Sequence, residues 1–547
     1  MLEKTKYISL LFTFMLLVSC NGSGGTSGVT AGFSVGGIVT GLTGAVVLQN
    51  NNSDNLTVSN NGQFTFATPV TNGSSYRISI FTQPAGQTCT VTGDSGTITA
   101  NLSSVVVTCA PVLNSLSTLM LTLPNHSIKP NNLAVIVASG DALSKSVAGY
   151  YQTARGIPAE NMITVNVPTG SDTISDSDFA ILKAAIDAQL SNTVQATLLT
   201  WTAPSRVVGK GSCVMSITSA MAFGFNPKYC ANSCAETMTS SYFDSESAQP
   251  WQDFQMRPSM MLGVSSLTTA KALIDLGVSA DSSQPPGDGY LIRTSDAARS
   301  VRFTDYLNLP YLYLPSVWSQ SPGIQLNYID NSTKRGDDSI SGKSDVLFYF
   351  TGLTRVPNIT TNRYRAGAIA DSLTSFGGYL PGGNGQMPIQ DWLSAGVTAS
   401  YGTVAEPCNY TRKFSQASVL IDHYYRGATL IEAYWKAVSE PGQGLFVGEP
   451  LAQPYRDTPD ITINGGQYVN GGKYVISTRS LRPNSNYALE YLSASSINWT
   501  TLASFKVARA QAQVLYAPLP PSNAIQIRWV GPCATNANKQ CTLSTSN

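Results

Sequence analysis

The chain has 547 residues, and its 33 lysines and arginines nearly balance 32 aspartates and glutamates, giving a formal net charge of +1. This balance excludes the strongly basic surface that is typical of proteins that bind nucleic acid. The length exceeds what one hydrophobic core spans and predicts roughly two to four domains. Charged residues make up 12% of the chain, against about 25% in typical soluble domains, which agrees with an exported protein.

The first 19 residues have the features of a secretory signal peptide. Lys4 and Lys6 precede an apolar run over residues 8–18. This run is too short to cross about 30 Å of hydrocarbon as a helix, so residues 1–19 are predicted to be a cleaved leader. Residues 17–20, Leu-Val-Ser-Cys, resemble the lipobox of bacterial lipoproteins. The resemblance implies that Cys20 carries palmitate-type lipid and becomes the first residue of the mature protein.

The residues after Cys20 suit a membrane tether. Residues 20–32 are rich in glycine and serine and are predicted to be a flexible linker. Asn21, in place of an aspartate, resembles the sorting pattern for the outer membrane, on either its periplasmic or its surface face. The lipid is then the expected contact with the membrane. The alternative is an ordinary signal peptide followed by a cysteine of no special role.

Both flanks of the mature chain carry β patterns. Residues 33–111 hold short strand patterns between Asn-, Gly- and Ser-rich turns, which predicts a small β-sandwich. This segment resembles a β module that serves as a spacer in bacterial surface proteins. Residues 459–547 predict a second β-sandwich. Disulfides are expected within each module, between Cys89 and Cys109 and between Cys533 and Cys541.

The middle of the chain alternates between two patterns over residues 115–456. Continuous apolar runs predict strands buried on both faces, and amphipathic segments predict helices between them, so we expect parallel βαβ units in an α/β domain. An insertion is expected at about residues 210–260. The expected strands lie at residues 133–138, 162–167, 196–201, 345–351 and 397–402, and the expected helices at 144–155, 176–190, 266–277, 365–376 and 419–438.

Two stretches of this domain carry a family resemblance. Residues 146–161 read SVAGYYQTARGIPAEN, and residues 370–451 include ADSLTSFGG at 370–378 and AGVTASYGTVAEP at 395–407. Together they resemble a family of exported bacterial proteins without an assigned function. That family is in turn distantly similar to the caspase-like α/β fold of the gingipain peptidases, so the resemblance implies a caspase-like central domain.

The peptidase residues that this resemblance implies are missing. In the gingipain arrangement a histidine follows one strand and a catalytic cysteine follows the next. No histidine follows residues 345–353, and residues 371–378 contain no cysteine. The chain has only two histidines, His126 and His423. We therefore expect a degenerate domain in a binding or structural lipoprotein, with a protein or glycan partner that the sequence does not identify.

A different catalytic pair stays open as the alternative. Cys408 follows a predicted strand and His423 lies on the next predicted helix, with Glu406 close enough in sequence to orient the imidazole. Such a triad would make the protein a cysteine peptidase or amidase. The competing interpretation is that Cys408 forms a disulfide. Once Cys20 is assigned to the lipid, eight of the nine cysteines remain, an even number in an oxidising compartment.

The four central cysteines are therefore expected to form two disulfides among Cys213, Cys230, Cys234 and Cys408. Their spacing matches no common zinc pattern, and no metal or cofactor is expected.

A ligand pocket is expected near the second stretch. In open α/β sheets ligands bind at the carboxyl ends of the strands. Polar residues gather at or after such ends, namely Asp371, Thr374, Ser375, Tyr401 and Arg412. Glu432, in contrast, is expected to close a capping box with Thr429.

Overall fold

A computed structural model describes residues 32–456 and 460–542, except 85–86, 112–118, 123–126, 231–233, 308, 310–322, 463–467, 470–472, 483–484, 508–512, 522 and 536–540. The predicted leader, most of the linker, Cys20 and His126 lie outside the described residues. The chain forms two compact units, Met1–Leu116 and Ser117–Asn547. No helix in the described part of the chain is long and apolar enough to span a membrane.

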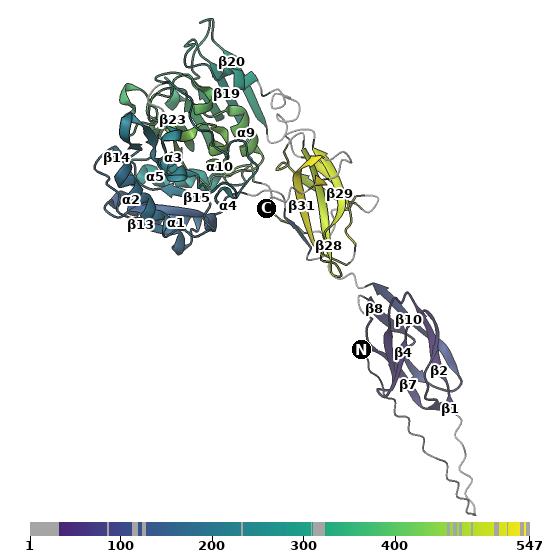
Figure 1. Cartoon of the computed structure of the whole chain (residues 1–547). Helices are drawn as coiled ribbons and strands as arrows, with labels where there is room; N and C mark the ends of the chain where they lie inside the picture. The colour runs from purple at the N-terminus through teal and green to yellow at the C-terminus, as the bar shows by residue number, and fades with distance from the viewer. Residues whose placement is uncertain are drawn as a thin grey trace, which may run out of the picture. The chain divides into compact units, whose positions relative to one another are not determined.

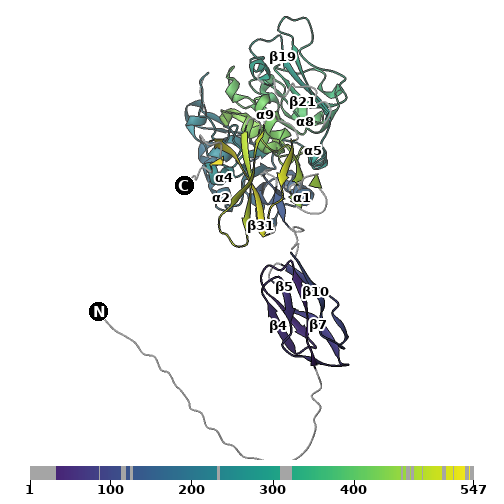
Figure 2. The ribbon, with the colours of Figure 1, turned by 90° about the vertical axis from the view of Figure 1, so that its right-hand side faces the viewer.

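The N-terminal unit consists of β-sheets (Figure 2). One sheet has the order β5-β2-β10-β8 and a second has the order β4-β3-β7-β9, while β1 pairs with β6. The bounds are β1 (Gly32–Phe33), β2 (Val35–Thr40), β3 (Val46–Asn50), β4 (Asp54–Val58), β5 (Gly62–Thr65), β6 (Val70–Thr71), β7 (Ser75–Thr82), β8 (Gln87–Thr92), β9 (Ser95–Thr97) and β10 (Leu102–Pro111). Alternate side chains of β3 and β7 enter one apolar core with those of β2 and β10, as the two-residue period of a strand requires.

The central sheet has ten described strands in the order β13-β12-β15-β18-β24-β23-β22-β21-β19-β20 (Figure 1). Their bounds are β12 (Leu133–Ala138), β13 (Met162–Val165), β15 (Ala196–Leu199), β18 (Ser259–Met261), β19 (Gly287–Arg293), β20 (Ile324–Asp330), β21 (Val346–Thr351), β22 (Tyr364–Ser372), β23 (Ala399–Thr403) and β24 (Gly444–Gly448). Side chains of β12, β21 and β23 are buried throughout, because helices and loops cover both faces of the sheet. A separate small sheet joins β14 (Thr173–Ser175), β16 (Arg206–Val208) and β17 (Val214–Ser216).

The expected parallel pairing is present within each half of the sheet, but the sheet as a whole is mixed. β23 and β24 run antiparallel, with Tyr401 opposite Phe446, whereas β18 and β24 run parallel. The sheet therefore has two parallel halves that point in opposite directions. A strand buried on both faces shows the same continuous apolar pattern in either direction, so the sequence pattern of β24 carries no information on its orientation.

Residues 365–376, expected to form a helix, contain most of a strand instead. β22 pairs with β21 and β23 in the middle of the sheet. Its sequence, YRAGAIADS, is buried over its last six residues, and a short buried run does not distinguish a strand from a helix by periodicity. Pairing on both edges outweighs the helix propensity of its alanines.

Helices connect and cover these strands (Figure 1). They are α1 (Ala142–Arg155), α2 (Asp176–Asp187), α3 (Ile217–Phe223), α4 (Pro250–Phe254), α5 (Leu267–Ala280), α6 (Phe303–Leu307), α8 (Gln390–Ser394), α9 (Ala417–Tyr425) and α10 (Leu430–Ala437). Helix α1 begins after Asp141, whose side chain accepts from the Leu143 amide, and ends at Gly156 with φ 64°, the left-handed conformation that favours glycine. The expected capping box of Thr429 and Glu432 is present at the start of α10.

The segment expected as an insertion belongs to the core of the central domain. Residues 210–260 include α3, which packs against β18 and β24, and the first strand residues of β18 itself. Met215, Ile217 and Ala220 are fully buried in the main apolar cluster.

Strands return after the central sheet, within the same compact unit. Among the described residues they form the sheets β26-β27-β30 and β29-β28-β31-β32, while β25 pairs with β11 (Met120–Thr122). The β11–β25 pair therefore joins the segment before the central sheet to the segment after it. The bounds are β25 (Asp460–Thr462), β26 (Tyr468–Val469), β27 (Lys473–Thr478), β28 (Ser485–Ser493), β29 (Thr500–Val507), β30 (Gln513–Pro518), β31 (Ala524–Thr535) and β32 (Cys541–Thr542).

Candidate functional site

Cys408, the proposed nucleophile, is bonded to another cysteine. Its sulfur forms a disulfide with Cys234, and their Cα atoms lie 5.5 Å apart. The Oε1 atom of Glu406 accepts a hydrogen bond from the backbone amide of Cys408 at 2.9 Å. Glu406 therefore holds the backbone of this turn, and Cys408 presents no thiol in the folded chain.

His423, the proposed base, is buried and bonded on both ring nitrogens. Only 2% of the residue is exposed. Nδ1 lies 3.0 Å from Nη2 of Arg426, and since a guanidinium can only donate, Nδ1 is the acceptor. Nε2 then carries the proton and donates to Asp244, 3.0 Å away. Burial, Arg426 and Lys436 hold the pKa of His423 well below its usual range.

These contacts correct the expected triad of Cys408, His423 and Glu406. Among the described residues, the side-chain hydrogen bonds of His423 go to Asp244 and Arg426 alone. The physical reason is that two residues of the segment 210–260 engage the two catalytic candidates: Cys234 forms the disulfide with Cys408, and Asp244 accepts the hydrogen bond of the imidazole. Short sequence separation between Cys408 and His423 did not bring their side chains together.

The other central disulfide joins Cys213 to Cys230. Cys89 and Cys109 are joined as expected, directly opposite each other on β8 and β10. The side chains of Cys533 and Cys541 lie outside the described residues, so their pairing stays a prediction.

The network around His423 links the central domain to the C-terminal strands. Arg426 donates to Asp422 at 2.9 Å and to both oxygens of Glu246 at 2.9 and 3.0 Å. Arg482, from the C-terminal part, donates to Asp244 at 2.6 Å and lies 3.2 Å from Glu246. Burial alone would raise the pKa of Glu246, but Arg426 and the other neighbouring basic groups together outweigh it and the pKa falls to about 2. These ion pairs therefore hold the C-terminal strands against the central domain, within the second compact unit.

The residues expected to line a pocket form internal contacts instead. Asp371, Thr374 and Tyr401 are each 2% exposed or less. Asp371 accepts from Arg302 at 2.6 Å and from Ser415 at 2.5 Å. Burial raises the pKa of Asp371, whereas Arg302 and Ser415 oppose that rise.

The remaining members of that set are also engaged. Thr374 donates to Gln386 at 2.6 Å, and Tyr401 donates to the carbonyl of Lys413 at 2.6 Å. The carbonyl of Ser375 accepts from Thr403 at 2.8 Å. Nε of Arg412 lies 3.1 Å from the buried Glu440. Asp371, Thr374 and Tyr401 thus belong to a buried hydrogen-bonded interior, whereas the side chain of Arg412 is 43% exposed and is held by its ion pair with Glu440.

The two stretches that carry the family resemblance meet at a buried carboxylate. Glu449 accepts from the hydroxyl of Tyr151 at 2.7 Å and from Nε of Arg155 at 3.0 Å. Arg155 also donates to Asp281 at 2.6 Å. Glu449 is fully buried, so these motif residues join α1, α5 and the end of β24 to one another.

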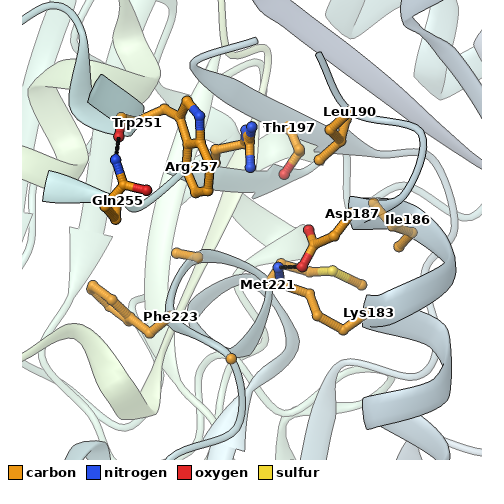
Figure 3. A pocket seen from close by; sticks show the side chains of 12 residues that line it. Lys183, Ile186, Asp187, Leu190, Thr197, Met221, Phe223, Trp251, Gln255 and Arg257 are labelled. Carbon is orange, nitrogen blue, oxygen red and sulfur yellow. Dashed lines mark hydrogen bonds and ion pairs between the residues drawn. The ribbon is translucent and has the colours of Figure 1, made fainter. Parts of the chain in front are cut away.

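A cavity lies elsewhere, between α2, α3 and α4, and sequence reasoning did not anticipate it (Figure 3). Its volume is about 280 Å³. Thr197 is the second residue of β15, so the cavity opens near the amino end of that strand and not at a carboxyl end. Its lining residues are Lys183, Ile186, Asp187, Leu190, Thr197, Met221, Ala222, Phe223, Gly224, Trp251, Gln255 and Arg257.

Arg257 and Trp251 form the polar wall of this cavity. The guanidinium carbon of Arg257 lies 3.5 Å from the centre of the Trp251 ring, a cation–π contact. Nε donates to the carbonyl of Val194 at 2.9 Å and Nη2 to that of Ser191 at 3.3 Å. Burial lowers the pKa of Arg257, although Asp187 opposes this. The wall is therefore rigid and positively charged.

The signal for this wall in the sequence is weak. Trp251 and Arg257 lie in the segment expected to be an insertion, and Thr197 sits within an apolar strand pattern. Nothing in the spacing of these residues along the chain indicates that they share a cavity.

Comparison with known protein-family models, curated proteins and solved structures finds no match to this chain. No group of three or more histidine, cysteine, aspartate or glutamate side chains suited to a metal ion occurs among the described residues. The structure itself is that of a multidomain protein rich in β-sheets, with one ten-stranded mixed sheet among the described residues that is covered by helices.

Proposed function

We propose that this chain is a lipid-anchored protein of the bacterial cell envelope that binds a ligand or partner and does not act as a thiol hydrolase. The observation that carries the proposal is the Cys234–Cys408 disulfide. A cysteine peptidase requires a thiolate as nucleophile, and the oxidised Cys408 provides none. His423 is neutral and bonded to Asp244 and Arg426, which leaves it no free nitrogen for proton transfer.

The architecture proposed for this function follows the sequence. The N-terminal segment is a β-sandwich module that acts as a spacer between the lipid at Cys20 and the central domain, and a second β-sandwich follows the central domain. The central domain is a degenerate caspase-like α/β domain, in which the Tyr151–Glu449 and Arg155–Glu449 contacts hold together the two stretches that carry the family resemblance. Asn21 agrees with a location at the outer membrane. The protein then lies on either the periplasmic or the surface face of that membrane.

Catalysis is tested by thiol counting together with a substrate screen. In native, non-reduced protein we expect no titratable thiol at Cys408 and no turnover of peptide or amide substrates by the parent, by Cys408→Ala or by His423→Ala. Ser400→Ala, which alters a buried hydroxyl of β23, serves as a control for handling. Turnover that both Cys408→Ala and His423→Ala abolish, at an unchanged melting temperature, would establish the hydrolase instead.

The lipid anchor is tested with the substitution Cys20→Ser, which replaces the sulfur of the side chain with oxygen. Cys20→Ser removes the only atom of that residue that accepts a thioether-linked lipid, so we expect loss of fatty-acid label and release from the membrane fraction. Metabolic labelling with a palmitate analogue measures the first, and fractionation measures the second. The matched control is Ser19→Ala, which keeps the cysteine. Undiminished label in Cys20→Ser would show that the lipidation proposal is wrong.

A further inference from the structure

Arg257 is a buried cation without a carboxylate of its own. The residue is 7% exposed, and its hydrogen bonds go to the neutral carbonyls of Val194 and Ser191. No ion pair of Arg257 with a carboxylate occurs among the described residues. Asp187, across the cavity, is paired with Lys183 at 2.5 Å. Two cations and one carboxylate thus line the cavity, which leaves one positive charge uncompensated.

Thr197 supplies an independent indication of a missing partner. The residue is 4% exposed, and its hydroxyl has no hydrogen-bond partner within the described part of the chain. Burying a hydroxyl without a partner costs roughly 1–3 kcal/mol, so native proteins seldom leave one in this state. Figure 3 shows this hydroxyl directed into the cavity, beside the guanidinium of Arg257.

The opposite wall is apolar and well supported. Met221 and Phe223 come from α3, and Leu190 follows the end of α2. The Phe223 ring stacks on Tyr229, with centroids 4.2 Å apart and planes 9° from parallel. A rigid ring in this position can hold an apolar group without rearrangement.

We propose that this cavity binds a small organic carboxylate, which accepts hydrogen bonds from Arg257 and Thr197 and places its apolar group against Met221 and Phe223. Guanidinium groups match carboxylates in geometry and charge. The volume of about 280 Å³ lies near the lower end of the roughly 300–1,000 Å³ range of ligand pockets, which favours a small ligand. The same chemistry is offered by a free short-chain acid and by the C-terminal residue of a peptide. This inference rests on the proposed binding function.

Calorimetric titration of the purified, detergent-solubilised mature chain tests the ligand class. The probes are sodium hexanoate for a free acid, N-acetylleucine for a peptide C-terminus, and hexanamide as the neutral counterpart of hexanoate. We expect at least one carboxylate to bind, and hexanamide to bind at least about tenfold more weakly than hexanoate, because charge-assisted hydrogen bonds are about twice as strong as neutral ones. The tighter of the two acids identifies the source of the carboxylate.

Two variants assign the binding to this cavity. Thr197→Val keeps the shape of the side chain and removes only the unpartnered hydroxyl, so it should fold normally and weaken binding about five- to tenfold. Ser400→Ala is its matched control, because the Ser400 hydroxyl is also buried without a partner in the described chain but does not line the cavity; it should leave affinity unchanged. Arg257→Gln should weaken binding more than tenfold, and its melting temperature reports any loss of the carbonyl contacts.

Three results would overturn the inference. If hexanamide binds as tightly as hexanoate, the site does not select a carboxylate. If Thr197→Val binds with unchanged affinity, the ligand lies elsewhere. If neither acid binds at millimolar concentration, the cavity does not bind this class of ligand. None of these results bears on whether the chain is a thiol hydrolase, which the thiol count and the substrate screen decide separately.

Discussion

Replacing Asp371 with alanine is expected to lower the free energy of unfolding by about 3–5 kcal/mol, the usual cost of breaking a buried ion pair from one side. Asp371 and Arg302 have side chains 2% and 3% exposed. Without the carboxylate, the guanidinium of Arg302 keeps hydrogen bonds to the carbonyl of Thr351 at 2.7 Å and to the oxygens of Ser415. Urea denaturation, followed by tryptophan fluorescence, measures the change.

Two further variants separate the buried charge from the loss of contacts in general. Asp345→Ala removes one side of the Arg365–Asp345 pair, whose side chains are 42% and 44% exposed, and should cost less than about 1 kcal/mol. The double variant Asp371→Ala/Arg302→Met should recover much of the lost stability, because an apolar replacement of a whole buried pair is often close to neutral. A single variant as stable as the parent would contradict the internal role assigned to Asp371.

The double substitution Cys234→Ser/Cys408→Ser is expected to lower stability by about 5 kcal/mol on the chain-entropy view of disulfides. The bond joins residues separated by 174 positions, so it constrains a large part of the unfolded chain. Two further contacts hold the residues that follow Cys234 against those that follow Cys408: Lys413 donates to the carbonyl of Ala235 at 2.6 Å, and the amide of Thr237 donates to Glu440. Melting temperature and denaturant midpoint under non-reducing conditions measure the effect.

The matched comparison is Cys213→Ser/Cys230→Ser, in which the bond spans 17 positions. Its expected cost is about 3 kcal/mol, since the loss grows with the logarithm of loop length. The order of the two effects is therefore the discriminating result. If the Cys234→Ser/Cys408→Ser protein unfolds at the same denaturant concentration as the parent, the bond contributes nothing to stability and the chain-entropy argument fails for it.

Local signals determined the elements that sequence reasoning identified correctly. The continuous apolar run of β12, the Asp141 cap of α1 and the Thr429/Glu432 capping box each depend on residues within a few positions of one another. The pairing of Cys89 with Cys109 also rests on residues close in the chain, because only 20 positions separate them and their strands pair directly.

Errors arose where a pattern allows two structures. The buried sequence of β22 satisfies a helix or a strand, and only its pairing with β21 and β23 selects the strand. Polar residues near strand ends, such as Asp371 and Tyr401, satisfy either a ligand site or an internal network. The choice depends on whether Arg302 and Ser415 reach Asp371, and both approach it only in the folded state.

By itself the sequence determined the β–α/β–β order of the described parts, the short-range disulfide and the helix caps, because each depends on neighbours along the chain. The tertiary structure alone decided the direction of β24, the partner of Cys408 and the cavity that joins Thr197 to Arg257. These features depend on which distant segments the sheet order places side by side. The apolar pattern of a strand predicts that a side chain is buried. It does not predict which distant residue that side chain contacts.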